Sequence, residues 1–215
     1  MPKLNAVACL IIVYSVGIIG MLTPYRDSFI LLTPFTLIAS MAFLIWGEEK
    51  RHERLYIGLG LAAFFGWLIE ALGTNTGAIF GAYTYGPTLG WHIWNTPFTM
   101  ALNWASLIYC TTLIAKEIGF KPKFERLGVS IIGATLMVFL DFFLEPVAIR
   151  YNFWAWQENS NNLFLVAPWK NYTSWWLISF IFIISLYPFF KNCKNSAAWV
   201  LFLLQFIFFM ALNFI

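Results

Sequence analysis

The sequence predicts an all-α fold, a polytopic helix bundle that crosses a membrane several times. Of the 215 residues, 60% are hydrophobic and only 11% are charged, whereas a soluble domain has roughly 25% charged residues. Apolar runs of at least about 17 residues, long enough to span a bilayer, also recur along the chain. This composition excludes nucleic-acid binding, secreted disulfide scaffolds and disordered chains, and it predicts one integral-membrane domain over residues 1–215.

We expect about seven transmembrane helices, one for each apolar run. The runs cover residues 6–22, 29–46, 55–72, 97–115, 129–145, 169–190 and 197–215. The first run lacks a small-residue cleavage site before Pro24, so we expect it to be retained as a helix.

Positive charges are divided unevenly between the connecting segments. With seven spans, the N-terminus and the breaks at 48–54, 116–126 and 191–194 share one side, which carries ten of the 13 Lys and Arg residues. The opposite side has only Arg26, Arg150 and Lys170. The positive-inside rule therefore predicts a multi-pass protein of the cell membrane, with the N-terminus in the cytoplasm and the C-terminus outside.

Two long breaks, at 73–96 and 146–168, fall on the non-cytoplasmic side. The first lies in a stretch without Asp, Glu, Lys or Arg from residue 71 to residue 115 and is rich in Gly, Thr and aromatic residues. Irregular backbone at membrane depth needs cover from protein or a cavity, so we expect both breaks to form aromatic lid loops over a pocket. The alternative is a simple interfacial belt of Tyr and Trp.

A repeat with an offset of 71 residues relates two parts of the chain, approximately 55–115 and 128–190. The matched pairs are Glu70 with Asp141, Phe80 with Tyr151, Tyr83 with Trp154, Tyr85 with Trp156, Pro97 with Pro168, Phe98 with Trp169 and Trp104 with Trp175. Two helices separate equivalent positions, so the repeats are parallel and related by an axis along the membrane normal. Chance matching of aromatic-rich sequence is the alternative interpretation.

Three acids inside the apolar runs are the candidate catalytic residues, Glu70, Asp141 and Glu145. An ionisable group in a span costs about 2.5–3.5 kcal/mol even on the lenient insertion scale. Asp141 and Glu145 are four residues apart, on one helical face, and Pro146 should end or bend that helix. Burial and neighbouring carboxyls disfavour charge, so we expect a protonated acid at neutral pH. The alternative is that the acids cap helices or form bonds across the bundle.

Uncharged polar and aromatic residues surround these acids in the sequence, Asn171 among them. We expect substrate to be bound by Asn75, Tyr83, Tyr85, His92, Asn103, Trp104, Trp154, Trp156 and Trp175. The second histidine, His52, lies in a charged break, and the three cysteines are widely spaced, so the sequence indicates neither a haem nor a metal site.

Two motifs carry a resemblance to a known family. They are Glu-x-x-Gly-x-x-x-Gly-x-x-Phe-Gly-x-Tyr-x-Tyr, from Glu70 to Tyr85, and Asp-x-x-x-Glu-Pro, from Asp141 to Pro146, with Phe-Trp-Ala-Trp following at 153–156. The chain resembles the integral-membrane carotenoid biosynthesis family, which includes bisanhydrobacterioruberin hydratase and carotenoid 1,2-hydratase. The resemblance spans roughly residues 55–190; one departure is the polar, Asn-rich segment 157–167, where a Gly-containing turn is expected.

The resemblance implies addition of water to the terminal C=C of an acyclic carotenoid end group, giving a tertiary alcohol. The residues fit this chemistry. An alkene offers only π-electrons, so hydration needs a general acid, a site that tolerates the tertiary cation and a positioned water. Neutral Asp141 or Glu70 could donate the proton, a second, ionised carboxylate could stabilise the cation, and Tyr and Trp ring faces could do the same.

The expected partners are an acyclic carotenoid and membrane lipid, without nucleic acid or cofactor; the oligomeric state is left open. Two other functions remain possible from the sequence. A carotenoid end-group cyclase or isomerase begins with the same proton transfer, and a non-catalytic isoprenoid transporter or binding protein could also use intramembrane acids and repeats.

Overall fold

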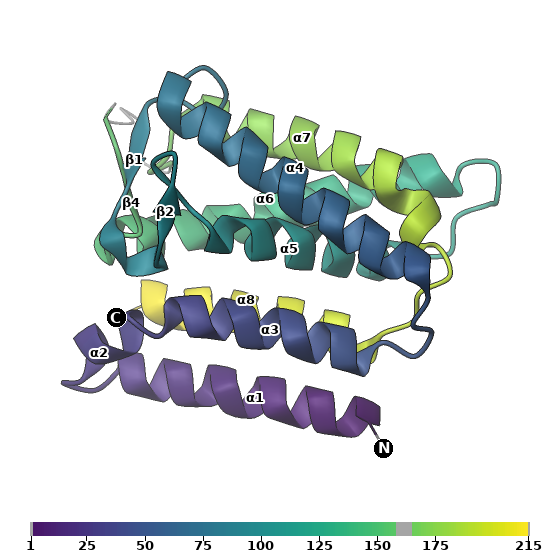
Figure 1. The fold of residues 1–215 in the computed structure, drawn as a ribbon, viewed down its shortest axis with the longest axis horizontal. Coiled ribbons are helices and arrows are strands. Elements are labelled where there is room, and N and C mark those ends of the chain that lie inside the picture. Colours follow the sequence, from purple (N-terminus) through teal and green to yellow (C-terminus); the bar gives the residue numbers. More distant parts are fainter. Residues whose placement is uncertain (1, 158–164, 215) are drawn as a thin grey trace.

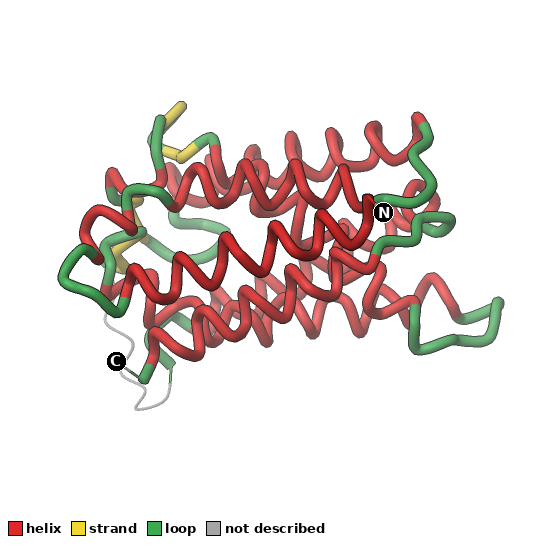
Figure 2. The backbone as a smooth tube through the Cα atoms, turned by 90° about the horizontal axis from the view of Figure 1, so that it is seen from below, coloured by secondary structure: helices red, strands yellow, loops and turns green. Residues whose placement is uncertain are grey.

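The computed structural model describes residues 2–157 and 165–214, and helices make up most of this part of the chain (Figure 1). The helices are α1 (Pro2–Met21), the short α2 (Arg26–Ile30), α3 (Thr33–Gly47), α4 (Glu53–Thr76), α5 (Thr99–Lys116), α6 (Glu125–Arg150), α7 (Trp169–Phe190) and α8 (Ser196–Asn213). The long helices run side by side along the long axis of the molecule, and the strands lie at one end of it (Figure 2).

Five helices in the described part of the chain are long and apolar enough to cross a membrane, namely α1, α4, α6, α7 and α8. The chain is therefore a multi-pass membrane protein. The apolar α3 has only 15 residues, and α5 does not meet the same criterion of length and composition. A helix lies at each predicted run, but the second run, residues 29–46, is divided between α2 and α3. A seven-span bundle stays a prediction.

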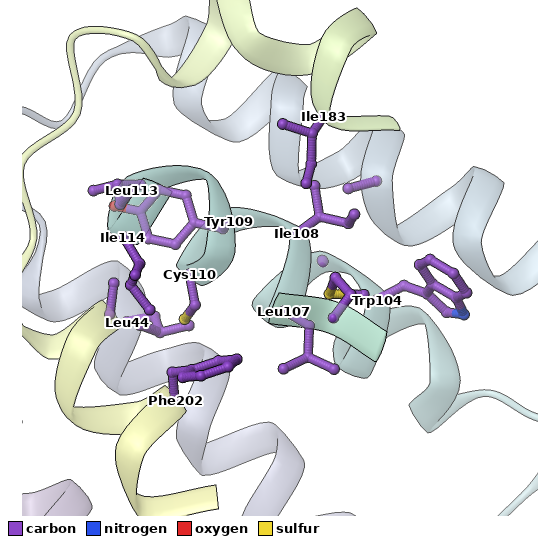
Figure 3. Close-up of a cluster of buried hydrophobic side chains, with 14 of the residues drawn as sticks. Leu44, Trp104, Leu107, Ile108, Tyr109, Cys110, Leu113, Ile114, Ile183 and Phe202 are labelled. Atoms are coloured by element: carbon purple, nitrogen blue, oxygen red, sulfur yellow. The ribbon is translucent and has the colours of Figure 1, made fainter. Parts of the chain in front are cut away.

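Helix α5 occupies the centre of the bundle, where it contacts α3, α4, α6, α7 and α8. Nearly all of its residues are buried. Figure 3 shows its side chains packed among Leu44 of α3, Ile183 of α7 and Phe202 of α8. A helix surrounded by protein can carry polar residues such as Asn103 and Thr111, because they do not face lipid.

The charged connecting segments gather at one end of the bundle, together with the N-terminus, and the strands and the C-terminus lie at the other end (Figure 1). Glu48, at the charged end, is a buried acid that the sequence placed in an exposed break. It accepts hydrogen bonds from the Tyr109 hydroxyl and from the backbone N–H groups of Lys50 (2.9 Å) and Lys194 (3.0 Å). Glu48 therefore ties the α3–α4 and α7–α8 connections to α5.

In the residues that the structure describes, the other end contains four short strands, which the all-α prediction did not include. Strand β1 (Tyr83–Tyr85) pairs antiparallel with β4 (Trp154–Trp156), and β2 (His92–Ile93) pairs antiparallel with β3 (Thr96–Pro97). The 3-10 helix η1 (Pro87–Leu89) lies between β1 and β2. The predicted lid loops are thus partly built of paired strands; residues 158–164 of the second lid lie outside the described residues.

Two predicted helix ends are wrong. Helix α4 continues through residues 73–76, which we expected to be loop, and ends at Gly77, whose φ of 62° is the left-handed conformation that glycine tolerates. Helix α6 continues past Pro146 to Arg150, so Pro146 does not end it. Proline removes one backbone donor, and here the buried residues on both sides, Glu145 and Val147, stay packed in the bundle.

Candidate functional site

Three buried carboxyl groups lie at the strand-bearing end of α4 and α6. The exposed fractions are 3% for Glu70, 2% for Asp141 and 1% for Glu145. Each of these acids stands on a helix, and the strand that follows that helix folds back toward it, which is why residues distant in sequence meet here.

Glu70 accepts three side-chain hydrogen bonds. The hydroxyls of Tyr83 and Tyr85 both donate to its Oε2, each at 2.7 Å, and the Trp104 indole Nε1–H donates to its Oε1 at 2.9 Å. Burial, followed by the charge of Glu70, raises the pKa of both phenols well above the usual value. Both tyrosines therefore remain protonated donors near neutral pH.

Glu145 accepts hydrogen bonds from β4, as Glu70 does from β1. The indole Nε1–H groups of Trp154 (3.1 Å) and Trp156 (2.9 Å) donate to its Oε2. Asn171, in the first turn of α7, donates through Nδ2 to Glu145 Oε1 at 3.0 Å and to Asp141 Oδ2 at 2.9 Å. Within the described part of the chain, Asp141 Oδ1 has no hydrogen-bond partner. One amide thus links two acids of α6.

The four strand rings form what we call the aromatic panel: Tyr83, Tyr85, Trp154 and Trp156. Alternate residues of a strand point to the same face, so each aromatic-x-aromatic sequence directs both rings toward the acids, while Thr84 and Ala155 are exposed. The pairing sets Tyr83 opposite Trp156 and Tyr85 opposite Trp154, with ring centroids 5.0 and 5.9 Å apart.

A small cavity of about 20 Å³ lies between the panel and the helices. We call it the acid cavity. Besides the panel, it is lined by Glu70, Glu145, Asn103, Asn171 and Trp175, and by the apolar Phe80, Met100 and Leu144. The two glutamates face this cavity from different helices. Asp141 is not part of its lining and reaches it through Asn171.

Most of the residues singled out from the sequence lie at or next to the acid cavity, but Asn75 and His92 do not. Asn75 is exposed, donates to the Trp94 carbonyl oxygen at 2.8 Å and accepts from Asn95 Nδ2 at 2.9 Å, so it holds the β2–β3 hairpin. His92 is also exposed, with its ring centroid 6.5 Å from that of Tyr85. Neither lines the acid cavity.

Asn171 was noted in the sequence but not chosen as a site residue. The available signal was an amide in the first turn of a span, where a buried polar group needs partners. The apolar lining residues gave no such signal, because their composition is that of any membrane helix. Within residues 2–157 and 165–214, no group of three or more His, Cys, Asp or Glu side chains is placed to hold a metal ion.

Comparisons with known proteins agree with the sequence motifs. A family model described as "Carotenoid biosynthesis protein" matches residues 28–215. Over 124 residues the chain is 29% identical to bisanhydrobacterioruberin hydratase of Haloarcula japonica; the match covers 56% of this chain and 41% of that protein. No solved structure matches the chain significantly. Because the family model covers most of the sequence, the chain belongs to the carotenoid biosynthesis protein family.

Proposed function

We propose that this chain is a carotenoid hydratase that adds water to the terminal C=C of an acyclic carotenoid end group. The observation that carries the proposal is the acid cavity, in which two buried carboxyl groups and four electron-rich rings face one small space. Family membership supports a carotenoid substrate, and the name of the Haloarcula japonica relative supports hydration.

The first step is protonation of the alkene, and we assign it to the Asp141–Glu145 pair. Two buried carboxyls on one helical face, linked by the single amide of Asn171, are most stable when they share one proton. Glu145 faces the cavity and Asp141 does not. Glu145 is therefore the group that hands the proton to a terminal alkene carbon. The proton that Glu70 later takes from the attacking water returns to the Asp141–Glu145 pair and restores it.

The second step is capture of the tertiary cation, and here Glu70 has the suitable environment. Three donors converge on its two oxygens, an arrangement that suits an ionised carboxylate. From the other side of the cavity, this charge stabilises the cation and then takes a proton from the attacking water. The faces of the panel rings add cation–π stabilisation.

Water has its own approach to the site. An outer cavity, which we call the vestibule, is bounded by Asp27, Thr84, Thr88 and Asn152 together with Tyr85 and Trp154. The last two residues also line the acid cavity. A solvent-open space with several polar lining groups, which shares Tyr85 and Trp154 with the acid cavity, favours capture of the cation by water, whereas a cyclase would need water to be excluded.

We also propose that residues 55–115 and 128–190 are parallel repeats. Antiparallel pairing of β1 with β4 about Thr84 and Ala155 supports a two-fold relation, and so does the stacking of Trp104 on Trp175, with centroids 4.5 Å apart. The acids depart from strict symmetry. Asp141 is the residue matched to Glu70, but Glu145, one helical turn further along α6, accepts the hydrogen bonds from β4.

Mass analysis of pigments tests the proposed reaction. Cells that accumulate an acyclic carotenoid would express the wild-type chain, Glu145→Gln or Glu53→Gln, the last altering an exposed acid on α4. We expect one added water per modified end with wild type and Glu53→Gln, and none with Glu145→Gln. An unchanged mass with a shifted absorption spectrum would indicate a cyclase or isomerase, and unaltered pigment would indicate transport or binding.

A further inference from the structure

A second cavity, larger than the acid cavity and mostly apolar, lies between α1, α3 and α8 on one side and α5 and α6 on the other. Its volume is about 90 Å³. We call it the apolar groove. Val13, Met21, Leu37, Phe208 and Phe209 form much of its wall, and its polar lining groups are uncharged. A phospholipid headgroup or a free carboxylate would find no charged partner among these lining residues, whereas a hydrocarbon chain meets suitable surfaces.

The apolar groove adjoins the acid cavity, and the two spaces share part of their walls. Met100, Asn103, Leu144 and Trp154 line both spaces. A linear molecule whose end lies beside Glu145 would therefore place the following part of its chain in the groove, between α1 and α8.

The dimensions restrict how much of the chain can be held. The groove follows α1 from Val13 to Met21, which is about 12 Å at 1.5 Å per residue. Thr36 and Leu37 on its α3 wall are half-buried, so the wall reaches the lipid-facing surface of the bundle there. A long polyene would thus keep one end segment inside and extend into the lipid beyond it.

We propose that the apolar groove binds the isoprenoid chain of an acyclic carotenoid directly behind the reacting end group. This inference rests on the proposed function for the identity of the reacting end. The protein recognises one end of its substrate at a time, and a carotenoid modified at both ends is released and rebound in the opposite direction.

Gly17 offers a direct test because it lines the groove. A Cβ atom at this position would meet only Phe208 Cε2, at 3.6 Å, an ordinary contact. Gly17→Ala should therefore fold and bind pigment normally, whereas Gly17→Phe would fill the groove. Gly60→Phe is the matched control, since Gly60 lies on the exposed face of α4 and a Cβ there meets nothing within 4 Å.

The variants would be purified from cells that accumulate lycopene, and bound pigment per protein would be measured by absorbance. We expect Gly17→Phe to lose about tenfold or more of the bound pigment, which is about 1.4 kcal/mol of binding free energy, because the Phe ring would occupy the space that the polyene needs. Gly17→Ala and Gly60→Phe should retain it. Equal retention by Gly17→Phe would overturn the proposal.

Photolabelling of the wild-type chain does not depend on how a variant folds. A diazirine-bearing acyclic isoprenoid should label peptides containing residues 13–21 and 205–209. Labelling confined to the outer depression between α4 and α7, around Phe65 and Ile181, would reject the groove. Wild-type protein that binds lycopene in the groove without hydrating it would reject the hydratase proposal alone; hydration with unaffected binding by Gly17→Phe would reject the groove alone.

Discussion

Asn171 makes the surroundings of the acids on α6 differ from those of Glu70 on α4. Its single amide donates to the carboxyls of both Asp141 and Glu145. Removing either acid would leave the other with a different partner and a different protonation state. Breaking a coupled pair has consequences beyond those of one lost contact, so the two acids should be studied together.

We expect Glu145→Gln and Asp141→Asn both to reduce the rate of hydration, by about 10² to 10⁴-fold for loss of a positioned general acid. Glu145→Gln should be the more severe, since Glu145 faces the acid cavity. Product analysis by mass, at equal protein level in the membrane, measures the difference. A near-normal rate for Glu145→Gln with an inactive Asp141→Asn would make Asp141 the direct proton donor.

Trp156→Phe should lower the rate of hydration less than Glu145→Gln or Asp141→Asn does. The substitution keeps an aromatic face toward the cavity but removes the Nε1–H that donates to Glu145 at 2.9 Å. A hydrogen bond to a charged or charge-sharing group is worth about 1.5–3 kcal/mol, so we expect a loss of about tenfold or more. Trp199→Phe, in the half-exposed part of α8, is the control; equal rates for both variants would show that the indole donor is dispensable.

At the scale of single elements, hydrophobic runs predicted where helices lie but not where they end. The segment 73–76 has the composition of a turn, yet three of its side chains bond back to carbonyl oxygens one turn earlier: Thr74 to Glu70, Asn75 to Ala71 and Thr76 to Leu72. These local bonds, with the cap at Gly77, extend α4. The alternation of aromatic residues was visible in the sequence, but the β1–β4 pairing joins segments about 70 residues apart and left no local signal.

Gly86 sets the close approach of these two strands. Its backbone N–H donates to the Phe153 carbonyl oxygen at 2.9 Å, and a Cβ atom on it would lie 2.0 Å from the Asn152 carbonyl oxygen. Backbone cannot move aside as a side chain can, so Gly86→Ala should destabilise the protein by about 1–3 kcal/mol and displace the aromatic panel.

Thermal unfolding in detergent and product yield would measure both effects of Gly86→Ala. Gly60→Ala, which adds a methyl group in open space on α4, should change neither. If Gly86→Ala retained wild-type stability and activity, the spacing between β1 and β4 would not be what orients the donors of the panel.

At the scale of the whole molecule, the motifs located the acids but not the space that receives the substrate. The two sequence motifs lie between Glu70 and Pro146, yet α1, α3 and α8 form one side of the apolar groove. A sequence pattern identifies the buried face of a helix when only that face is apolar. In a membrane helix the lipid-facing side is apolar as well, so the pattern does not show which side packs against protein. The contact between residues 13–21 and 205–209 follows only from how the helices pack.

The orientation of the bundle is a prediction for the whole chain. The N-terminus and the charged connections lie at one end, and the strands and C-terminus lie at the other (Figure 1). Ten of the 13 Lys and Arg residues belong to the first end, so the positive-inside rule places it in the cytoplasm.

A reporter that is active only outside the cytoplasm should therefore be active when fused after residue 215 and inactive when inserted between Lys121 and Lys123. Both positions lie outside the helices, so each fusion leaves every long helix intact and the contrast depends on sidedness. Cytoplasmic location of the C-terminal reporter, with residues 121–123 outside, would invert the bundle and make the acid cavity open toward the cytoplasm. The two reporters on one side would mean that one of α6, α7 and α8 does not cross the membrane, and the seven-span topology would be wrong.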